Sequence, residues 1–458
     1  MNTIYEPARN IPVADEVDVC VLGGSCTGVS AALRAARLGA RVAVVEQQNC
    51  FGGGATSGMV CIWHSLYDTS FKKQIIGGTT QEIIERLKRR RHAIFERPRP
   101  EPPYRMNTTM TYWLNTEELK IELDEMVLEA GVIPYLHTFY AAPVIEDGKL
   151  TAAIIENKSG RQAIKAKIFI DATADGDLMI HLGAESYSND NLQPATTGAR
   201  VYGLNRIVDR FWDVNQLIKD HRDECGMRDI GWNAFIPGTP EVRFWAKSTV
   251  DKDCSDGGQL TEAEMEGRRQ VRKMMDVIRK HADGGGDITL LALGSHIGIR
   301  ETRQIVCRYK LTFDDIVNGR EFDDAIAYCA YPPDIHHLDK PGATYYYLDG
   351  VKHYSCGVPT DEPEYSRWRD ETPDDPTYWQ IPYRSMTRAD MPNAIVCGRA
   401  IDAEKGAFAA VRCMVSLNQT GEAAGVAAYE ALDSSRGVCD IDIPATRKKM
   451  RDGGSIIP

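Results

Sequence analysis

The 458-residue sequence contains no pair of cysteines spaced as Cys-x-x-Cys, although it has twelve cysteines in all. Iron–sulfur, zinc-ribbon and thioredoxin-like sites depend on that spacing, so its absence argues against these classes of protein. No apolar run reaches the roughly 18–20 residues that span a bilayer, and the N-terminus lacks the apolar segment of a secretory signal. These absences predict a cytoplasmic protein with reduced cysteines and no membrane partner.

Positive charge is also scarce, because 54 Lys and Arg face 65 Asp and Glu and the net charge is −11. This balance argues against a nucleic-acid partner. One basic run, residues 86–92, follows a stretch with helical apolar spacing and is interpreted as an exposed helix end, with a phosphate or RNA contact as the alternative. No internal repeat is present, and the length predicts two structural units rather than one core.

The segment VDVCVLGGSCTGVSAALRAARLGARVAVVE, residues 17–46, predicts a strand–helix–strand unit. Residues 17–22 form a short apolar run typical of a buried parallel strand. The apolar residues that follow the loop share one helix face, and Gly39 ends that helix. A second apolar strand, residues 41–45, ends at Glu46. Such a unit typically binds a dinucleotide, although a core unit without a ligand is the alternative.

The loop of this unit reads Gly23-Gly24-Ser25-Cys26-Thr27-Gly28. Gly23 permits a tight turn, Gly28 allows the helix to pack on the strands, and the helix N-terminus offers N–H groups to a pyrophosphate. Ser25 replaces the usual middle glycine, and we expect its hydroxyl or N–H to face the pyrophosphate. Glu46 is placed to bind a ribose diol and would repel a 2′-phosphate, which disfavours NADP.

Further elements follow this unit. A loop with glycines at 52, 53, 54 and 58 predicts close backbone approach to a ligand. We expect an extended connection at 97–104, an Asp147-Gly148 hairpin turn and a tight turn at Gly176. The remaining expected elements are helices at 76–92, 116–130 (with Thr116 as N-cap) and 261–282, and strands at 168–170 and 394–397, the last followed by a long helix rich in Ala and Gly.

The unit 17–46, the Gly52-Gly53 loop, IDATADGD (170–177) and VCGR with GEAAGVAA near the C-terminus occur in a specific order. Together with GIRETRQI (298–305), PPDIH (332–336) and IPYRSM (381–386), they resemble the FAD-dependent oxidoreductase family of the two-dinucleotide-binding-domain flavoproteins, the superfamily of fumarate reductase and glutathione reductase. The resemblance covers nearly the whole chain.

The resemblance implies an α/β fold, in which a Rossmann-like FAD-binding domain with a central parallel sheet carries a discontinuous α+β substrate domain. We assign residues 15–100, 150–188 and 390–435 to the FAD-binding domain, 101–149 and 189–389 to the substrate or cap region, and 436–458 to a C-terminal tail.

The resemblance also implies a resident FAD. The residues implied to bind it are Gly23, Gly24, Ser25, Cys26, Thr27, Gly28, Glu46, Gly52, Gly53, Ala172, Thr173, Asp175, Gly398, Arg399, Asn418, Gly421 and Ala424. Ala174 stands where the family usually has glycine. A second glycine-rich strand–helix–strand unit, as many NAD(P)H-using flavoproteins have, is absent, which argues against NAD as a second partner.

The predicted function is hydride transfer from a small organic substrate to bound FAD, by a dehydrogenase or an oxidase with an unassigned acceptor such as oxygen. Two alternatives stay open: a flavin-dependent monooxygenase that uses NAD(P)H and oxygen, and a non-catalytic or RNA-associated flavoprotein.

Catalytic candidates are few because the sequence has ten histidines. His64 and His336 are candidate bases, with a packed strand histidine and a covalent flavin attachment point as the other interpretations of His64. Arg300 is interpreted either as part of an internal Arg–Glu network or as a clamp for a substrate carboxylate. Tyr383 and Arg384 are expected to line the site. His336 and His337 flank acidic residues, but we expect a loop there and no metal site.

Overall fold

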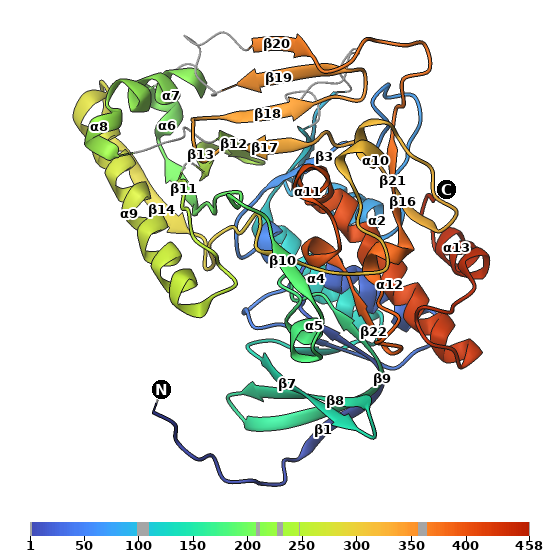
Figure 1. The fold of residues 1–458 in the computed structure, drawn as a ribbon. Helices are drawn as coiled ribbons and strands as arrows, with labels where there is room; N and C mark the ends of the chain where they lie inside the picture. Colours follow the sequence, from blue (N-terminus) through green and yellow to red (C-terminus); the bar gives the residue numbers. More distant parts are fainter. Residues whose placement is uncertain are drawn as a thin grey trace.

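A seven-stranded sheet forms the centre of the computed structural model, which describes residues 2–98, 110–207, 211–226, 232–246, 248–355 and 364–457 (Figure 1). Four strands run parallel in the order β6-β2-β1-β9, and β22 adds in parallel to β9, whereas β8 and β7 continue from β9 in antiparallel fashion. The strands are β1 (Val13–Leu22), β2 (Val42–Val45), β6 (Ile133–Tyr135), β7 (Phe139–Glu146), β8 (Lys149–Asn157), β9 (Gly160–Asp171) and β22 (Ala394–Val396).

The end of β1 and all of β2 are buried on both faces of the sheet, which explains why residues 19–22 and 42–45 are continuously apolar in sequence. Val19 and Val21 of β1 point into a core formed with helices, whereas Cys20 and Leu22 point into a second core on the opposite face, shared with β8 and β9. The helices on the first face are α1 (Cys26–Arg37), α2 (Gly78–Lys88), α4 (Thr116–Glu129) and α12 (Met414–Ser434).

Helix α12 packs very closely against α1, and its glycines make this possible. A Cβ atom on Gly421 would lie 2.0 Å from the carbonyl oxygen of Thr27, and one on Gly425 would lie 2.2 Å from that of Ala31. The small-residue composition of α12 therefore serves helix–helix contact.

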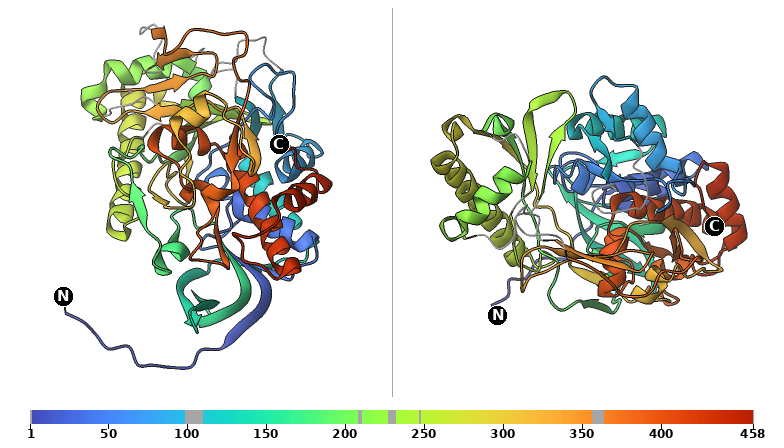
Figure 2. Two further views of the ribbon diagram at one scale, coloured as in Figure 1. Left: turned by 45° about the vertical axis from the view of Figure 1, so that its right-hand side comes forward. Right: turned by 90° about the horizontal axis from the view of Figure 1, so that it is seen from above.

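Two further groups of elements lie on the other side of the molecule from β7 and β8 (Figures 1 and 2). One group is the antiparallel sheet β12-β13-β11-β14 beside three helices, and the other is the sheet β17-β18-β19-β20. These elements are β11 (Gly198–Tyr202), β12 (Trp232–Ile236), β13 (Thr239–Ala246), β14 (Thr289–Leu293), α7 (Phe211–Asp220), α8 (Arg222–Cys225), α9 (Gly257–His281), β17 (Asp334–His336), β18 (Ala343–Tyr346), β19 (Val351–Ser355) and β20 (Glu364–Arg367).

Smaller elements complete the described fold. They are the sheets β3 (Ile62–His64)–β5 (Met110–Leu114)–β4 (Ile94–Glu96), β10 (Ser186–Ser188)–β15 (Arg303–Ile305) and β16 (Ala325–Cys329)–β21 (Trp379–Pro382), the α-helices α5 (Asp177–His181), α6 (Leu204–Ile207), α10 (Phe313–Val317), α11 (Lys405–Val411) and α13 (Ile443–Asp452), and the 3-10 helices η1 (Gly53–Ala55), η2 (Gly285–Asp287), η3 (Tyr383–Met386) and η4 (Gly398–Ala400).

Most of the expected elements are present, with shifted ends. Helices α2, α4 and α9 overlap the predicted helices, and the Asp147-Gly148 turn joins β7 to β8. The predicted N-cap of α4 was wrong, because the side chain of Asn115, not Thr116, accepts the hydrogen bond from the N–H of Glu117. Most of the predicted 97–104 connection lies outside the described residues.

The domain limits stay a prediction, and the sheet topology bears on one of them. Strands β6 and β7, which were assigned to the cap region, hydrogen-bond to β2 and β8 of the central sheet. The boundary at residue 149 thus separates neighbouring strands of one sheet. In the predicted C-terminal tail, α13 packs on α12.

Candidate active site

A cavity of about 600 Å³ opens where the parallel strands β1, β2, β9 and β22 end. It is lined by residues one or two positions after the ends of those strands, namely Gly23, Glu46, Ala172 and Gly398. Ligand sites of open α/β sheets lie at this carboxyl edge. Residues 196–345 supply further parts of the wall, among them Phe244, Ile297 and Tyr345.

The first loop is shaped by close backbone contacts. Gly23 has a φ of +100°, and a Cβ atom there would lie 2.1 Å from the carbonyl oxygen of Ala172 at the end of β9. A Cβ atom on Gly28 would lie 1.9 Å from the carbonyl oxygen of Gly23. Ser25 is the N-cap of α1, and its hydroxyl accepts a hydrogen bond of 3.4 Å from the N–H of Gly28. The loop is therefore held by its own backbone, with Ser25 at the cavity wall.

Glu46 is fixed at the end of β2. Its carboxylate accepts hydrogen bonds from the N–H of Gly24 (2.7 Å) and of Gln48 (2.8 Å), and the residue is only 7% exposed. Burial raises the pKa of Glu46, although these hydrogen bonds oppose the shift. Because the same residue lines the cavity, it connects the glycine loop to the ligand site.

A third segment, residues 172–175, approaches the cavity from the end of β9. Asp171 is buried and its carboxylate accepts hydrogen bonds from the N–H (3.1 Å) and hydroxyl (2.7 Å) of Thr173. Ala174 has a φ of +74°, a conformation that favours glycine, so this departure from the family pattern costs backbone strain. Arg399 donates to the carbonyl of Ala174 (3.1 Å) and to the carboxylate of Asp175.

Two long helices direct their N-termini at this cavity. Ser25, Cys26 and Thr27 at the start of α1 line it, and so do Cys413 and Met414 at the start of α12. A helix N-terminus carries unpaired N–H groups and a partial positive charge, which favours anionic groups such as a pyrophosphate.

Asn418, one turn further along α12, is buried against the cavity. Its side-chain oxygen has no hydrogen-bond partner among the described residues. A polar atom of this kind and two helix N-termini around a glycine-lined cavity fit a dinucleotide cofactor.

The FAD dependent oxidoreductase family, as a sequence profile, matches residues 18–450. The chain therefore belongs to the FAD-dependent oxidoreductases, and its cofactor is FAD. No curated protein matches the sequence significantly.

Several solved structures are similar at low sequence identity. A geranylgeranyl bacteriochlorophyll reductase-like protein from Thermoplasma acidophilum has a TM-score of 0.44 and 13% identity, over 96% of this chain and 83% of that one. A flavin-dependent brominase has a TM-score of 0.44 and 11% identity over 95% and 83%. A myxobacterial chondrochloren halogenase has 0.42 and 12% over 96% and 79%.

A polar cluster forms another part of the cavity wall. Its centre is Asp334, the first residue of β17, whose carboxylate accepts hydrogen bonds from Arg412 (2.8 Å) and from the hydroxyl of Tyr331 (2.7 Å). The Nε2 atom of His336 lies 3.5 Å from the other carboxylate oxygen. All four residues line the cavity.

His64 reaches the same cluster from β3. Its Nδ1 atom lies 3.2 Å from the sulfur of Cys413, and its ring meets that of Tyr331 edge-on at 4.5 Å between centroids. These contacts join the N-cap of α12 to a strand about 350 residues earlier in the sequence.

The charges of this cluster follow from its burial and its ion pair. Burial alone would raise the pKa of Asp334, but the neighbouring His336, the charge of Arg412 and the hydrogen bond from Tyr331 hold it well below its usual range. Burial lowers the pKa of His64 to about 4, although the charge of Asp334 opposes this shift. Burial also raises the pKa of the Cys413 thiol to about 12. At neutral pH the cluster thus holds an ionised Asp334–Arg412 pair beside a neutral His64 and a neutral thiol.

Most of the residues named from the sequence meet at this one cavity. Those that line it are Gly23, Ser25, Cys26, Thr27, Glu46, Gly52, Gly53, His64, Ala172, Thr173, Asp175, Arg300, His336, Gly398, Arg399 and Asn418. Gly24, Gly28, Gly421 and Ala424 do not line it. Gly28 and Gly421 instead allow close backbone packing, so the lack of a side chain at these two positions serves the fold.

Tyr383 and Arg384 were expected to line the site, and the structure corrects this. Tyr383 is 2% exposed, and its hydroxyl donates to the carbonyl of Val438 (2.8 Å). Arg384 is 35% exposed and pairs with Asp323 (3.1 Å) and Asp324 (3.2 Å). Neither lines the cavity, because the hydroxyl of Tyr383 points to Val438 and the guanidinium of Arg384 points to the two aspartates.

The segment around residue 300 also differs from the expected Arg–Glu network. Glu301 is buried and accepts hydrogen bonds from Asn189 (2.7 Å) and Gln193 (2.9 Å), whereas Arg303 pairs with Asp177 (2.9 Å). Arg300 lines the cavity and donates to Pro194 and Thr196.

Sequence reasoning missed Arg412, Cys413, Tyr331 and the central role of Asp334. One signal was present: Arg412 and Cys413 stand directly before the long Ala/Gly-rich helix, where the chain must turn toward the cavity.

Proposed function

We propose that this FAD-dependent oxidoreductase oxidises a small organic substrate by hydride transfer to its flavin, with His336 as the proton acceptor. The observation that carries the proposal is the His336–Asp334 pair at the cavity wall, in which Asp334 is held by Arg412 and Tyr331. A suitable substrate carries a C–H bond on a carbinol or amine carbon, so that oxidation releases one hydride and one proton.

FAD, when bound, supplies the hydride acceptor, and oxygen or another acceptor later removes the two electrons. Residues of this chain accept the proton that the substrate releases. His336 takes the O–H or N–H proton as the C–H bond breaks, and its imidazolium is stabilised by the adjacent carboxylate of Asp334. Arg412 and Tyr331 keep that carboxylate ionised and oriented.

His64 has a different part in this proposal. With a pKa of about 4 it is neutral at pH 7 and a weak proton acceptor, so we assign it a positioning role beside Tyr331 and Cys413. Apolar residues of the cavity wall, among them Val60, Ile62 and Phe244, limit water around the reacting carbon.

The test compares His336→Gln with His337→Gln in the FAD-loaded protein. His337 is the neighbouring histidine, donates or accepts at Thr344 (2.7 Å) and does not line the cavity. A panel of alcohols and amines is first screened anaerobically for bleaching of the flavin absorbance. For a substrate that bleaches it, we expect His336→Gln to slow flavin reduction by about 10²- to 10⁴-fold, the usual contribution of a positioned base. His337→Gln should reduce at close to the parent rate.

Two outcomes would contradict the proposal. Equal reduction rates in the two variants would remove His336 from the chemistry. Substrate-stimulated oxidation of NADPH with oxygen incorporation, and no anaerobic bleaching by substrate, would instead favour the monooxygenase reaction.

A further inference from the structure

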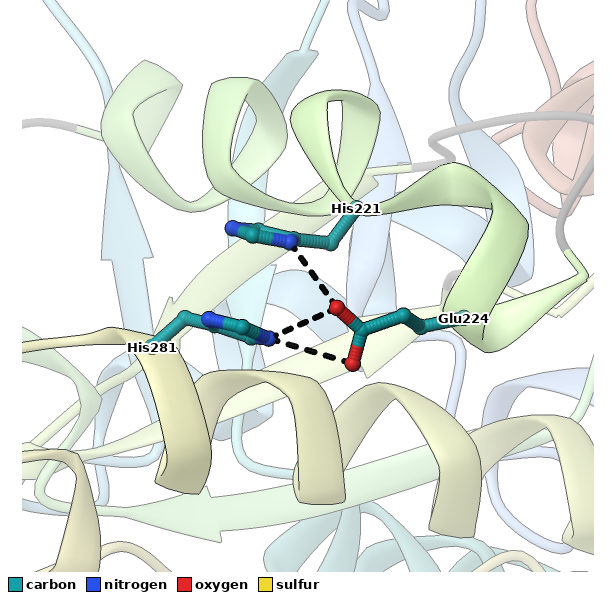
Figure 3. A group of neighbouring side chains, drawn as sticks. All are labelled: His221, Glu224 and His281. Carbon is teal, nitrogen blue, oxygen red and sulfur yellow. Dashed lines mark hydrogen bonds and ion pairs between the residues drawn. The ribbon is translucent and has the colours of Figure 1, made fainter.

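Two histidines and a glutamate converge far from the cavity, where α8 meets the end of α9 (Figure 3). His221 directly precedes α8, Glu224 lies within it, and His281 is the last residue of α9. Glu224 Oε1 lies 3.2 Å from His221 Nδ1 and 2.9 Å from His281 Nε2. One donor atom from each residue lies within 4.8 Å of the other two.

We propose that this cluster is a binding site for a divalent transition metal, with zinc as the first candidate. Two imidazoles and one carboxylate are a ligand set that zinc accepts, with water in the fourth position. Zinc–ligand bonds of about 2.0–2.2 Å in a tetrahedron place neighbouring ligand atoms roughly 3.4 Å apart. The separations of Glu224 from the two imidazole nitrogens, 3.2 and 2.9 Å, are close to this value. To bind one ion, the two stacked rings must tilt apart so that the in-plane lone pair of each nitrogen points at it.

The two imidazole rings are already oriented together. They stack with their centroids 3.5 Å apart and their planes at 13°, and each ring points a nitrogen at the same carboxylate (Figure 3). Both nitrogens therefore face the carboxylate of Glu224, on the side of the cluster where an ion would bind.

The surrounding charge also favours a cation. His281 ends a helix of 25 residues, and the C-terminus of a helix carries a partial negative charge. The competitor is Lys280, whose ammonium lies 2.8 Å from Glu224 Oε2. Its side chain is 65% exposed and can move into solvent when a metal takes its place.

A metal here would connect α8 to the end of α9 above their shared apolar core, which includes Ile218, Cys225 and Ile278. None of the three ligands lines the cavity. The site would therefore stabilise the substrate region without entering the reaction, and it is independent of the function proposed above.

The test uses untagged, FAD-loaded, full-length protein freed of metal and titrated with Zn²⁺ by calorimetry and with Co²⁺ by visible absorption. We expect one ion per chain and the spectrum of a four-coordinate Co²⁺ site. His281→Ala and Glu224→Gln should weaken binding by at least about 10- to 100-fold, the range that even an outer-shell partner costs. Lys280→Ala removes the competing ammonium and should tighten binding.

The Lys280→Ala variant separates a metal site from a plain hydrogen-bonded cluster. If neither the parent protein nor Lys280→Ala binds Zn²⁺ saturably, the proposal is wrong. It is equally wrong if His281→Ala and Glu224→Gln bind as the parent does, because the ion would then sit elsewhere. Flavin absorbance and the unfolding temperature without metal show that each variant is folded.

Discussion

The glycine loops and the polar cluster are two parts of one cavity wall, and they are built in different ways. Gly23, Gly28 and Glu46 lie within 24 residues of sequence and are placed by one strand–helix–strand unit. The polar cluster joins His64, Asp334 and Arg412, which come from three distant parts of the chain. Backbone packing shapes the first part, whereas a buried ion pair and its hydrogen bonds shape the second.

This difference predicts different failures. In the glycine loops, adding a methyl group to Gly23 or Gly28 should be destabilising, since the carbonyl oxygens of Ala172 and Gly23 leave no space for it. In the polar cluster the loss of a charge should be the damaging change, since the buried Asp334 has Arg412 as its ion-pair partner. The following changes test that contrast, beginning with the largest expected effect.

Gly28→Ala should be the most damaging change. Alanine favours a helix interior by about 1 kcal/mol over glycine, but its Cβ would lie 1.9 Å from the carbonyl oxygen of Gly23. Moving that backbone should cost more than the roughly 1–3 kcal/mol of ordinary overpacking and should abolish FAD retention. Flavin absorbance after gel filtration and chemical unfolding measure both effects. Gly286→Ala is the control, because no heavy atom lies within 4 Å of its added Cβ; equal stability of the two variants would refute the steric argument.

Arg412→Met should lower the free energy of unfolding by about 3–5 kcal/mol, because it leaves the carboxylate of Asp334 buried without its cation. The double variant Arg412→Met with Asp334→Asn removes the stranded charge and should be more stable than Arg412→Met alone. Urea unfolding of the parent, Arg412→Met, Asp334→Asn and the double variant gives the coupling free energy of the pair. Simple additivity would show that the pair contributes no electrostatic coupling.

Lowering the pH should weaken the fold through His64. Its folded pKa of about 4 lies below the ordinary value of 6.5, so the unfolded chain binds more protons throughout that window. Its contribution is complete above pH 6.5 and is lost as the pH falls toward 4, by about 3 kcal/mol.

Comparison with His64→Gln isolates this term. Burial raises the pKa of Asp177 to about 6, which acts in the opposite direction over the same window and is common to both proteins. The difference in unfolding free energy between parent and variant should therefore shrink as the pH falls from 6.5 to 4. A pH-independent difference would mean that His64 is not buried in the neutral form.

Tyr383→Phe should have the smallest effect of the four. It removes the hydrogen bond to Val438 and leaves that carbonyl unpaired, which costs about 1 kcal/mol. Turnover should be unchanged because the hydroxyl does not reach the cavity. Tyr331→Phe is the matched comparison, since its hydroxyl binds Asp334 and its loss should lower the rate of flavin reduction. A strong loss of turnover in Tyr383→Phe would show that Tyr383 contributes to the active site after all.

The reach of sequence reasoning differs between the same two parts. The first strand, its glycine loop and Glu46 could be recognised because each step is local: an apolar run, a turn residue and a helix face. The hairpin at Asp147-Gly148 was equally local, and it is present. The N-cap of α4 was predicted one residue too late. Asn115 and Thr116 are both good capping residues, and the structure shows that Asn115 has the extended backbone of an N-cap whereas Thr116 is the first residue of the helix.

The polar cluster was only half recognisable. His64 was named because it follows the glycine loop, and His336 because it lies in the family-like PPDIH segment. Neither observation identified Arg412 or Tyr331 as a partner. Tyr383 and Arg384 were misplaced for the same reason: the sequence does not show that Tyr383 hydrogen-bonds to Val438 or that Arg384 pairs with Asp323 and Asp324.

By itself, the sequence determined the strand–helix–strand unit at residues 17–46, since glycines and apolar periodicity within one short segment define it. The order of its motifs resembled the FAD-dependent oxidoreductases, and the match of that family over residues 18–450 confirms the resemblance. Only the tertiary structure decided that Asp334 is the centre of the polar cluster, that Gly421 packs helices together, and that His221, Glu224 and His281 meet. Those relations depend on how elements that are distant in sequence pack on one another. The free energy of that packing is shared among many contacts, so no single sequence position reveals it.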